Sequence, residues 1–154
     1  TSHLERIRRT RIVSAFSDFE ALVGGIISQN NSYLNYRTQM RRVYRVLNFI
    51  PDRFIPKNLD PLKLGYKTSY IIDCAERFGS CPITEITGIG PYTEKLFKIF
   101  QKRDYTCFYI DCLTERIMKE QYNITGDLDK HSRRLWGGYR GLAEAYLQRF
   151  FEIK

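Results

Sequence analysis

The chain has 154 residues, of which 43% are hydrophobic, and a formal net charge of +8 at pH 7. Its length allows one domain or two small lobes that share a chain, and its apolar fraction is sufficient for a packed core. No apolar run approaches the roughly 18–20 residues of a membrane-spanning helix. The excess of Lys and Arg favours a polyanionic partner, although it says nothing about the fold.

The first predicted element is an amphipathic helix behind Ser17. Ser17 and Glu20 have the spacing of a capping box, in which each side chain accepts a hydrogen bond from the other residue's backbone N–H. The apolar residues of this segment recur at helical spacing: Phe19, Leu22, Val23, Ile26 and Ile27. Gly24 and Gly25 interrupt the stripe and lower helix propensity, so we expect another helix to pack closely against them.

A second helix is predicted to follow Ser32, which can cap it. Arginines recur at steps of four on one face of this helix: Arg37, Arg41 and Arg45. Such a row is either a solvated face or a set of phosphate contacts. A proline-containing stretch at 51–61 then breaks the chain, and a third helix is expected over about 68–78.

The sequence Ile-Thr-Gly-Ile-Gly-Pro-Tyr at 86–92 predicts a tight turn between two short helices. Pro82 opens the first of them, and residues 91–102 form the second. Gly88 and Gly90 can adopt a positive φ, and they let another backbone approach closely. The amides at the start of the second helix point outward with the positive end of its dipole, which favours an anion such as a phosphate.

Residues 105–110 are the only strand-like run, and we expect them to form extended chain rather than a sheet. Asp111 follows at the N-cap position of a helix expected over about 112–121, and the last helix is expected from about residue 139. Almost every segment has a helical period, which predicts an all-α fold.

The four cysteines do not have the paired spacing of a zinc site. Six residues separate Cys74 from Cys81, four separate Cys107 from Cys112, and the two pairs lie far apart. We expect buried free thiols, with a disulfide that involves Cys107 as the alternative. No metal and no other cofactor is expected.

Residues 86–100 (ITGIGPYTEKLFKIF) resemble the helix-hairpin-helix of the DNA glycosylases related to endonuclease III, although Thr87 stands where many members have proline. Four further segments resemble this superfamily in the same order: 19–37, 64–78, 108–117 and 135–147. The last segment is similar to the final helix of the alkyladenine and 8-oxoguanine branches, whereas the hairpin is similar to that of mismatch glycosylases. The resemblance covers nearly the whole chain from residue 17.

The resemblance implies a two-lobed all-α fold with a central helical barrel that contains the helix-hairpin-helix. Within one glycosylase domain over 1–154, one lobe would span about residues 20–104 and the other would combine 1–19 with 105–154. Because no cysteine follows Cys112, we expect no iron–sulfur cluster of the kind that many relatives carry. The resemblance also implies a monomer inside the cell, in the cytoplasm or nucleoid, or in the nucleus.

The resemblance assigns catalysis to Asp111, although helix capping alone also explains an aspartate there. A carboxylate beside the sugar stabilises the positive charge that builds as a base leaves, and it can orient or deprotonate the attacking water. Members that also cut the DNA backbone have a lysine at the position of Tyr92, which forms a Schiff base. Tyr92 therefore predicts a hydrolytic, monofunctional enzyme, in which Lys95 faces solvent or phosphate.

The resemblance also implies contacts with double-stranded DNA. Gln29 and Asn30, followed by Asn31, would fill the space that an extruded nucleotide leaves, and capping of the preceding helix is the alternative. Hairpin residues would hold the DNA backbone: Gly88, Ile89, Gly90, Tyr92 and Thr93. Trp136 and Tyr139 would form walls of a base pocket, or else belong to the core.

We therefore predict a monofunctional DNA glycosylase of base excision repair that acts on a flipped damaged or mismatched base. The hairpin favours uracil or thymine opposite guanine, and the C-terminal segment favours an alkylated or oxidised purine. One alternative is a non-catalytic helix-hairpin-helix DNA-binding module, against which the intact Asp111 argues. The other is a bifunctional glycosylase/lyase, against which the tyrosine at position 92 argues.

Overall fold

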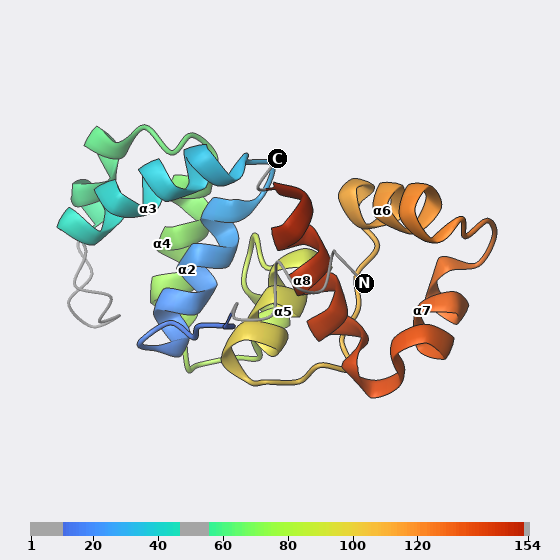
Figure 1. The fold of residues 1–154 in the computed structure, drawn as a ribbon. Coiled ribbons are helices and arrows are strands. Elements are labelled where there is room, and N and C mark those ends of the chain that lie inside the picture. Colours follow the sequence, from blue (N-terminus) through green and yellow to red (C-terminus); the bar gives the residue numbers. More distant parts are fainter. Residues whose placement is uncertain (1–10, 47–55, 153–154) are drawn as a thin grey trace. The chain divides into compact units, whose positions relative to one another are not determined.

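The computed structural model describes residues 11–46 and 56–152, without the side chains of 56–58 and 149–152. Most of these residues are helical and none of them is in a β-strand, which confirms the predicted all-α class (Figure 1). Of the predicted break at 51–61, residues 51–55 lie outside the described residues, and the rest belongs to a 3₁₀ segment that contains Pro61. The helical elements are α2 Asp18–Ser28, α3 Tyr33–Val46, η2 Pro56–Leu62, α4 Lys67–Arg77, η3 Ile83–Glu85, α5 Pro91–Leu96, η4 Phe97–Gln101, α6 Cys112–Tyr122, α7 Leu128–Trp136, η5 Gly137–Tyr139 and α8 Arg140–Glu152.

The described residues divide into two compact units. The hairpin unit comprises residues 14–97, and in it α2 packs against α3, α4 and α5. The Asp111 unit comprises residues 98–152 together with 11–13, and in it α6 and α7 both pack against α8. The lobe boundaries that the resemblance implied, near residues 20 and 104, stay a prediction.

Helix α2 lies at the centre of the hairpin unit because its apolar stripe is fully buried. The buried residues of this helix include all five of the predicted stripe: Phe19, Leu22, Val23, Ile26 and Ile27. Each such side chain contributes roughly 1.5–3 kcal/mol on burial. A Cβ on Gly25 would lie 2.7 Å from Cγ2 of Thr93, so a glycine is needed for α5 to approach α2. The predicted close packing at this stripe is therefore confirmed.

Both predicted N-caps of the hairpin unit are present. The Ser17 hydroxyl accepts from the N–H of Glu20 at 3.1 Å, and the Ser32 hydroxyl accepts from the N–H of Asn35 at 3.3 Å. The reciprocal bond of the predicted capping box differs, because the carboxylate of Glu20 accepts from the N–H of Phe16 at 3.0 Å and not from that of Ser17. The buried Glu20 also accepts a short hydrogen bond from the hydroxyl of Tyr44, and burial together with this bond raises the pKa of Tyr44 above its usual range. The first turn of α2 is thus joined to α3.

The first hairpin helix is shorter than predicted. The stretch that Pro82 precedes forms only the 3₁₀ turn η3, because Ile86 leaves the helical region with φ −78° and ψ 130° and is buried in the core. The second helix is confirmed, since α5 continues directly into the π-helical turn η4. The Asp73 carboxylate accepts from the N–H of Thr87 at 2.7 Å, which lowers the pKa of Asp73 and ties the turn to α4.

The Asp111 unit contains a helix that the sequence did not predict. Helix α7 is rich in charge, and Leu128 and Ser132 are its buried residues, so it has no clear apolar stripe. Asp127 caps it by accepting from the N–H of Lys130 at 3.0 Å. The last helix begins at Arg140, as predicted, and α6 has nearly the predicted bounds.

The four cysteines are free thiols, as predicted, but the predicted burial is right only for Cys74. Burial raises the pKa of the Cys74 thiol to about 12, so this thiol is a core residue. The other three are not fully buried, and Cys112 is exposed. In the described part of the chain, no helix is long and apolar enough to span a membrane.

Candidate functional site

Gln29 connects the end of α2 to the hairpin turn. Its side-chain amide donates to the carbonyl of Gly88 at 2.5 Å and to the hydroxyl of Thr93 at 2.8 Å. Its own N–H donates to the carbonyl of Ile26, so Gln29 also caps α2. The structure therefore brings together three of the predicted DNA-binding residues, but the amide of Gln29 is engaged in shaping the turn.

The two hairpin glycines have different reasons to be glycine. Gly88 has φ +86°, and a Cβ there would lie 2.4 Å from the ring of Tyr70, so no other residue fits without rearrangement. Gly90 has φ −89° and ψ −176°, an extended conformation that any residue adopts, so the freedom of glycine to adopt a positive φ is not used at this position. No heavy atom lies within 4 Å of a Cβ on Gly90, and the residue is exposed. The backbone at Gly90 is thus open to an approaching ligand.

The remaining hairpin side chains face inward to different degrees. Ile89 and Thr93 are buried, so a ligand contact of Ile89 would use its backbone and not its side chain. Tyr92 is half-buried, and the Nζ of Lys95 lies 5.4 Å from the centre of its ring. Lys95 is only 5% exposed, so the prediction that it faces solvent is wrong. A lysine one turn beyond Tyr92 packs over that ring because both residues lie on one face of the helix.

Asn30 and Asn31 follow α2 but differ in their surroundings. Asn30 is exposed with φ 47°, a left-handed conformation that asparagine tolerates, and its amide donates to the hydroxyl of Tyr66 at 3.3 Å. The amide of Asn31 donates to the carbonyl of Ile27 at 3.1 Å. The capping alternative therefore applies to Asn31, whereas Asn30 follows the end of α2 in a left-handed conformation and bonds to Tyr66.

Lys67 is a residue of this region that the sequence analysis missed. Its ammonium group donates to the carbonyl of Ile27 at 2.7 Å, and burial lowers its pKa. Lysine is rarely buried, so nothing in the local sequence distinguished it from a solvated lysine.

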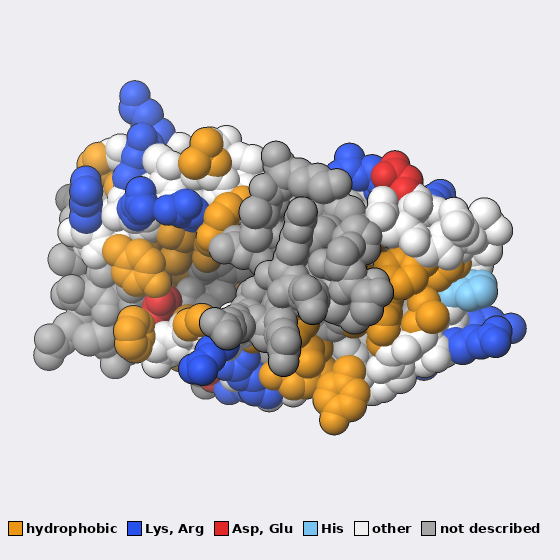
Figure 2. Space-filling view, in the orientation of Figure 1, with side chains coloured by type: hydrophobic (Ala, Val, Ile, Leu, Met, Phe, Trp, Pro, Cys, Tyr) orange, Lys and Arg blue, Asp and Glu red, His pale blue; other side chains and the backbone are white. Residues whose placement is uncertain are grey.

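Helix α3 presents basic side chains to solvent. Lys and Arg side chains gather over the α3 end of the face shown in Figure 2. The arginines of this helix are exposed: Arg37, Arg41, Arg42 and Arg45. The guanidinium of Arg37 lies 5.7 Å from the ring centre of Tyr33, which is also exposed. The face therefore combines positive charge with an aromatic ring.

Asp111 in the other unit caps α6, as predicted. Its Oδ1 accepts from the N–H of Thr114 at 2.7 Å, and its Oδ2 accepts from the side-chain amide of Gln148 at 2.9 Å. The extended chain before Asp111 is fixed to α8, because the N–H of Gly141 donates to the carbonyl of Tyr105 at 2.9 Å. A Cβ on Gly141 would collide with the carbonyl of Cys107, so a glycine permits this approach.

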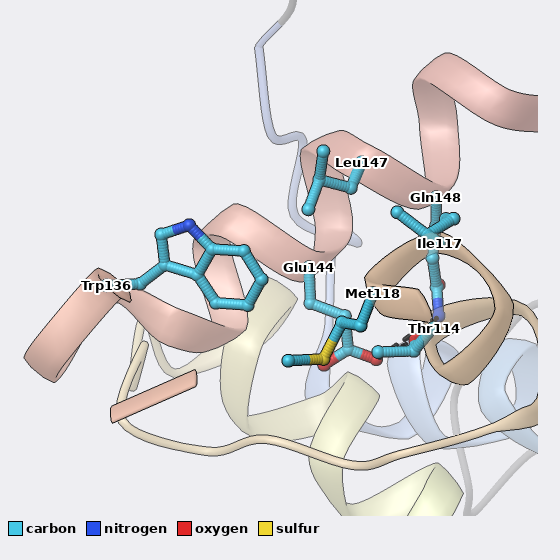
Figure 3. A pocket seen from close by; sticks show the side chains of 7 residues that line it. All are labelled: Thr114, Ile117, Met118, Trp136, Glu144, Leu147 and Gln148. Carbon is cyan, nitrogen blue, oxygen red and sulfur yellow. Dashed lines mark hydrogen bonds between the residues drawn. The ribbon is translucent and has the colours of Figure 1, made fainter. Parts of the chain in front are cut away.

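Gln148 and Glu144 complete a polar cluster that the sequence analysis missed. The amide of Gln148 also donates to the hydroxyl of Thr114 at 2.8 Å and to Glu144 at 3.2 Å (Figure 3). The Thr114 hydroxyl donates to the same oxygen of Glu144 at 3.1 Å. Glu144 and Gln148 are four residues apart and lie on one face of α8, and that spacing was the signal available in the sequence.

The two predicted base-pocket residues lie in different surroundings. Trp136 is the last residue of α7 and lines one pocket together with Glu144 and Gln148 (Figure 3). Its ring packs against Phe108 and edge-on against Tyr122, at centroid distances of 6.2 and 5.7 Å. Tyr139 is 67% exposed and is not among the residues that line this pocket.

The residues that line this pocket come from α6, α7 and α8: Thr114, Ile117, Met118, Trp136, Glu144, Leu147 and Gln148. Among the described residues, no group of three or more His, Cys, Asp or Glu side chains could hold a metal ion.

No protein-family model and no curated protein sequence matches the chain. Solved structures do match it. The apo 8-oxoguanine glycosylase/lyase of Clostridium acetobutylicum has a TM-score of 0.77 at 18% identity over 97% of this chain and 65% of its own. The same protein with double-stranded DNA that contains cytosine opposite 8-oxoG has a TM-score of 0.77 at 20% identity, over 97% and 63%.

A third structure, MBOgg1 in complex with a low-affinity DNA ligand, has a TM-score of 0.79 at 18% identity over 98% of this chain and 64% of its own. This chain thus spans less than two thirds of the length of each of the three proteins. At this identity the likeness shows the fold, which is the helix-hairpin-helix glycosylase fold that the sequence resemblance predicted.

Proposed function

We propose, from this shared fold, that the protein is a DNA glycosylase that hydrolyses the N-glycosidic bond of a flipped base in double-stranded DNA. The observation that carries the proposal is Asp111 at the start of α6, whose carboxylate oxygens are held by the N–H of Thr114 and by the side-chain amide of Gln148 from α8. A carboxylate fixed in this way can stabilise the positive charge that develops on the sugar and can orient the attacking water.

Tyr92 supports the hydrolytic mechanism, because its side chain offers no amine for a Schiff base. The Clostridium acetobutylicum neighbour carries the name glycosylase/lyase, so the bifunctional alternative has support of its own. Lys95 is the residue that would supply the amine in that case, since its ammonium group is buried against the ring of Tyr92. The choice between the two reactions is therefore a choice between water and Lys95 as the nucleophile.

We assign DNA binding to three places in the hairpin unit: the hairpin turn, the turn at Asn30 that follows α2, and the face of α3 that carries the exposed arginines. Gly90 is exposed with open space around it, so a phosphate can approach its backbone. The exposed arginines of α3 add positive charge within the same unit, and binding through phosphates is expected to weaken as salt rises. We propose a monomer that works inside the cell, with no membrane association.

Among the substrates, an oxidised purine is favoured because the structural neighbours are named for 8-oxoguanine or were solved with 8-oxoG DNA. Uracil or thymine opposite guanine remains the competing substrate class, on account of the tyrosine in the hairpin. A non-catalytic DNA-binding module would bind the same DNA but would have no use for the fixed carboxylate of Asp111.

The test is incubation with a panel of duplexes, each of which holds one lesion or mismatch. A glycosylase without lyase activity gives strands that break only after hot alkali, and borohydride traps no protein–DNA adduct. Strand cleavage without alkali, together with an adduct that disappears in Lys95→Ala, would establish the lyase instead. Binding without base release from any duplex would favour the non-catalytic module.

A further inference from the structure

Glu144 is a buried carboxylate to which the proposed reaction gives no role. It is 1% exposed, and it accepts from the Thr114 hydroxyl at 3.1 Å and from the N–H of Tyr109 at 3.4 Å. Burying a carboxylate is costly unless hydrogen bonds replace the lost water. A structural role would explain the burial of Glu144, and its hydrogen bond with the side-chain amide of Gln148 indicates that role.

The side-chain amide of Gln148 can lie in only one orientation. Its nitrogen is within 3.2 Å of oxygens of Asp111, Thr114 and Glu144. Carboxylate oxygens accept hydrogen bonds, so the NH₂ end of the amide faces the two acids and the carbonyl end faces away. The Thr114 hydroxyl donates its proton to Glu144 and therefore offers a lone pair to Gln148. Glu144 and Thr114 together fix which way the amide points.

This arrangement determines the orientation of the Asp111 carboxylate. The backbone of Thr114 holds one of its oxygens, as in any capped helix. A cap alone leaves the second oxygen without a fixed direction. Gln148 donates to that second oxygen and so defines the plane of the carboxylate.

We propose that Gln148 is a positioning residue, which orients Asp111 for base release while Glu144 fixes the Gln148 amide. The inference rests on the proposed function, because it assigns Gln148 a task only if Asp111 acts on a substrate. A catalytic group displaced by about 1 Å can lose roughly 100-fold in rate, so a lost positioning bond has a measurable effect.

The test compares substitutions of similar size. Gln148→Met keeps the length of the side chain and removes the donor, and we expect the single-turnover rate of base release to fall about 10- to 100-fold. Gln148→Glu keeps the shape but places a third carboxylate beside Asp111 and Glu144, and we expect a larger fall. A role in packing alone would give the opposite order, because glutamate matches glutamine in shape more closely than methionine does.

The affinity for lesion-containing duplex is measured in the same variants and is expected to change less than about threefold, since a positioning bond acts on the rate. Gln121→Met, at an exposed position of α6, is the matched control and should behave as wild type. Should Gln148→Glu fail to fold by circular dichroism, Gln148→Asn replaces it. This variant keeps the amide on a shorter chain, and its rate is expected to lie between those of wild type and Gln148→Met.

A double-mutant cycle completes the test. In an Asp111→Asn background, Gln148→Met should cause no further loss of rate, because there is no carboxylate left to orient. Full additivity of the two losses, or a Gln148→Met rate within twofold of wild type, would overturn the inference while the glycosylase proposal stands. If wild type releases no base from any duplex, the proposed function fails and this inference fails with it.

Discussion

Each unit of the molecule contains a glutamine whose amide donates to several acceptors, and the two differ in the charge of those acceptors. Gln29 donates to a backbone carbonyl and a hydroxyl, which are neutral, whereas Gln148 donates to two carboxylates and a hydroxyl. A hydrogen bond to a charged group contributes about 1.5–3 kcal/mol, and a neutral one about 0.5–1.5 kcal/mol.

The comparison indicates what each glutamine does. The neutral acceptors of Gln29 belong to the hairpin turn, so losing this residue should change the shape and stability of a binding element. The charged acceptors of Gln148 include the candidate catalytic group, so losing that residue should change a rate. Substitutions in the two units should therefore differ in whether they change stability, DNA affinity or rate.

Asp111→Asn should lower the rate of base release by about 100- to 1000-fold, or roughly 3–4 kcal/mol of transition-state stabilisation. Asparagine also caps helices well, so the free energy of unfolding should change by less than about 1 kcal/mol. Single-turnover assays and denaturant unfolding measure the two quantities. A variant with the wild-type rate would remove Asp111 from the chemistry and leave it as a cap.

Gly88→Ala should destabilise the hairpin unit by about 2–3 kcal/mol. The reason is the positive φ of Gly88 combined with the collision of a Cβ with Tyr70. Denaturant unfolding measures the loss. Gly90→Ala is the matched control, since its conformation suits alanine and its surroundings are open, and it should lie within about 0.5 kcal/mol of wild type. Equal losses at the two glycines would contradict the structure of the turn.

Gln29→Leu should cost about 1–2 kcal/mol, because the Gly88 carbonyl and the Thr93 hydroxyl lose their donor in a partly buried place. Affinity for DNA should fall as the turn loosens, while the rate from the bound complex stays within a few fold. A rate loss as large as that of Gln148→Met would show that the division between the two glutamines is wrong.

Gly90→Val should weaken binding of undamaged and lesion-containing duplexes by the same few-fold factor. A bulky side chain at this open position obstructs a backbone that is proposed to approach a phosphate, and phosphate contacts carry no base preference. Titrations at two salt concentrations measure the effect. A folded Gly90→Val protein that binds both duplexes as tightly as wild type would exclude the hairpin as the DNA anchor.

The smallest predicted effect is a pH dependence at Asp73. The N–H of Thr87 stabilises the ionised carboxylate, so the folded-state pKa lies below the unfolded value. This contribution to stability is present above the unfolded pKa of about 3.9 and is lost as the pH falls through the lowered folded pKa. In Asp73→Asn, the stability lost on acidification should be smaller than in wild type by this contribution. Identical acid-unfolding curves for wild type and Asp73→Asn would contradict the prediction.

Much of the fold was predictable because it rests on local patterns. The capping residues, the apolar stripe of α2 and the Gly-containing turn all leave marks within a few residues of sequence. Helix α7 has no such pattern. Most of its residues are charged or polar, and its two buried residues do not form an apolar stripe that could be recognised in the sequence. The length of the first hairpin helix was overestimated. The local sequence pattern could not show that Ile86 leaves the helical conformation and packs in the core.

The candidate site was predictable only in part, for a different physical reason. Asp111 was identified because it caps a helix and matches a known motif. Its contact with Gln148 joins positions 37 residues apart, which no local pattern encodes. The same holds for the burial of Lys95 and Lys67, since a lysine in a short helix is normally solvated and only tertiary packing covers it.

Trp136 is the only tryptophan of the chain, and it lies in the Asp111 unit with its ring in contact with those of Phe108 and Tyr122. Its fluorescence therefore gives a built-in optical signal for one unit alone, without any engineered label. The melting curve of that emission can be set against a whole-chain signal such as circular dichroism. Coincident curves would mean that both units unfold in one cooperative step, and separated curves would give each unit its own stability.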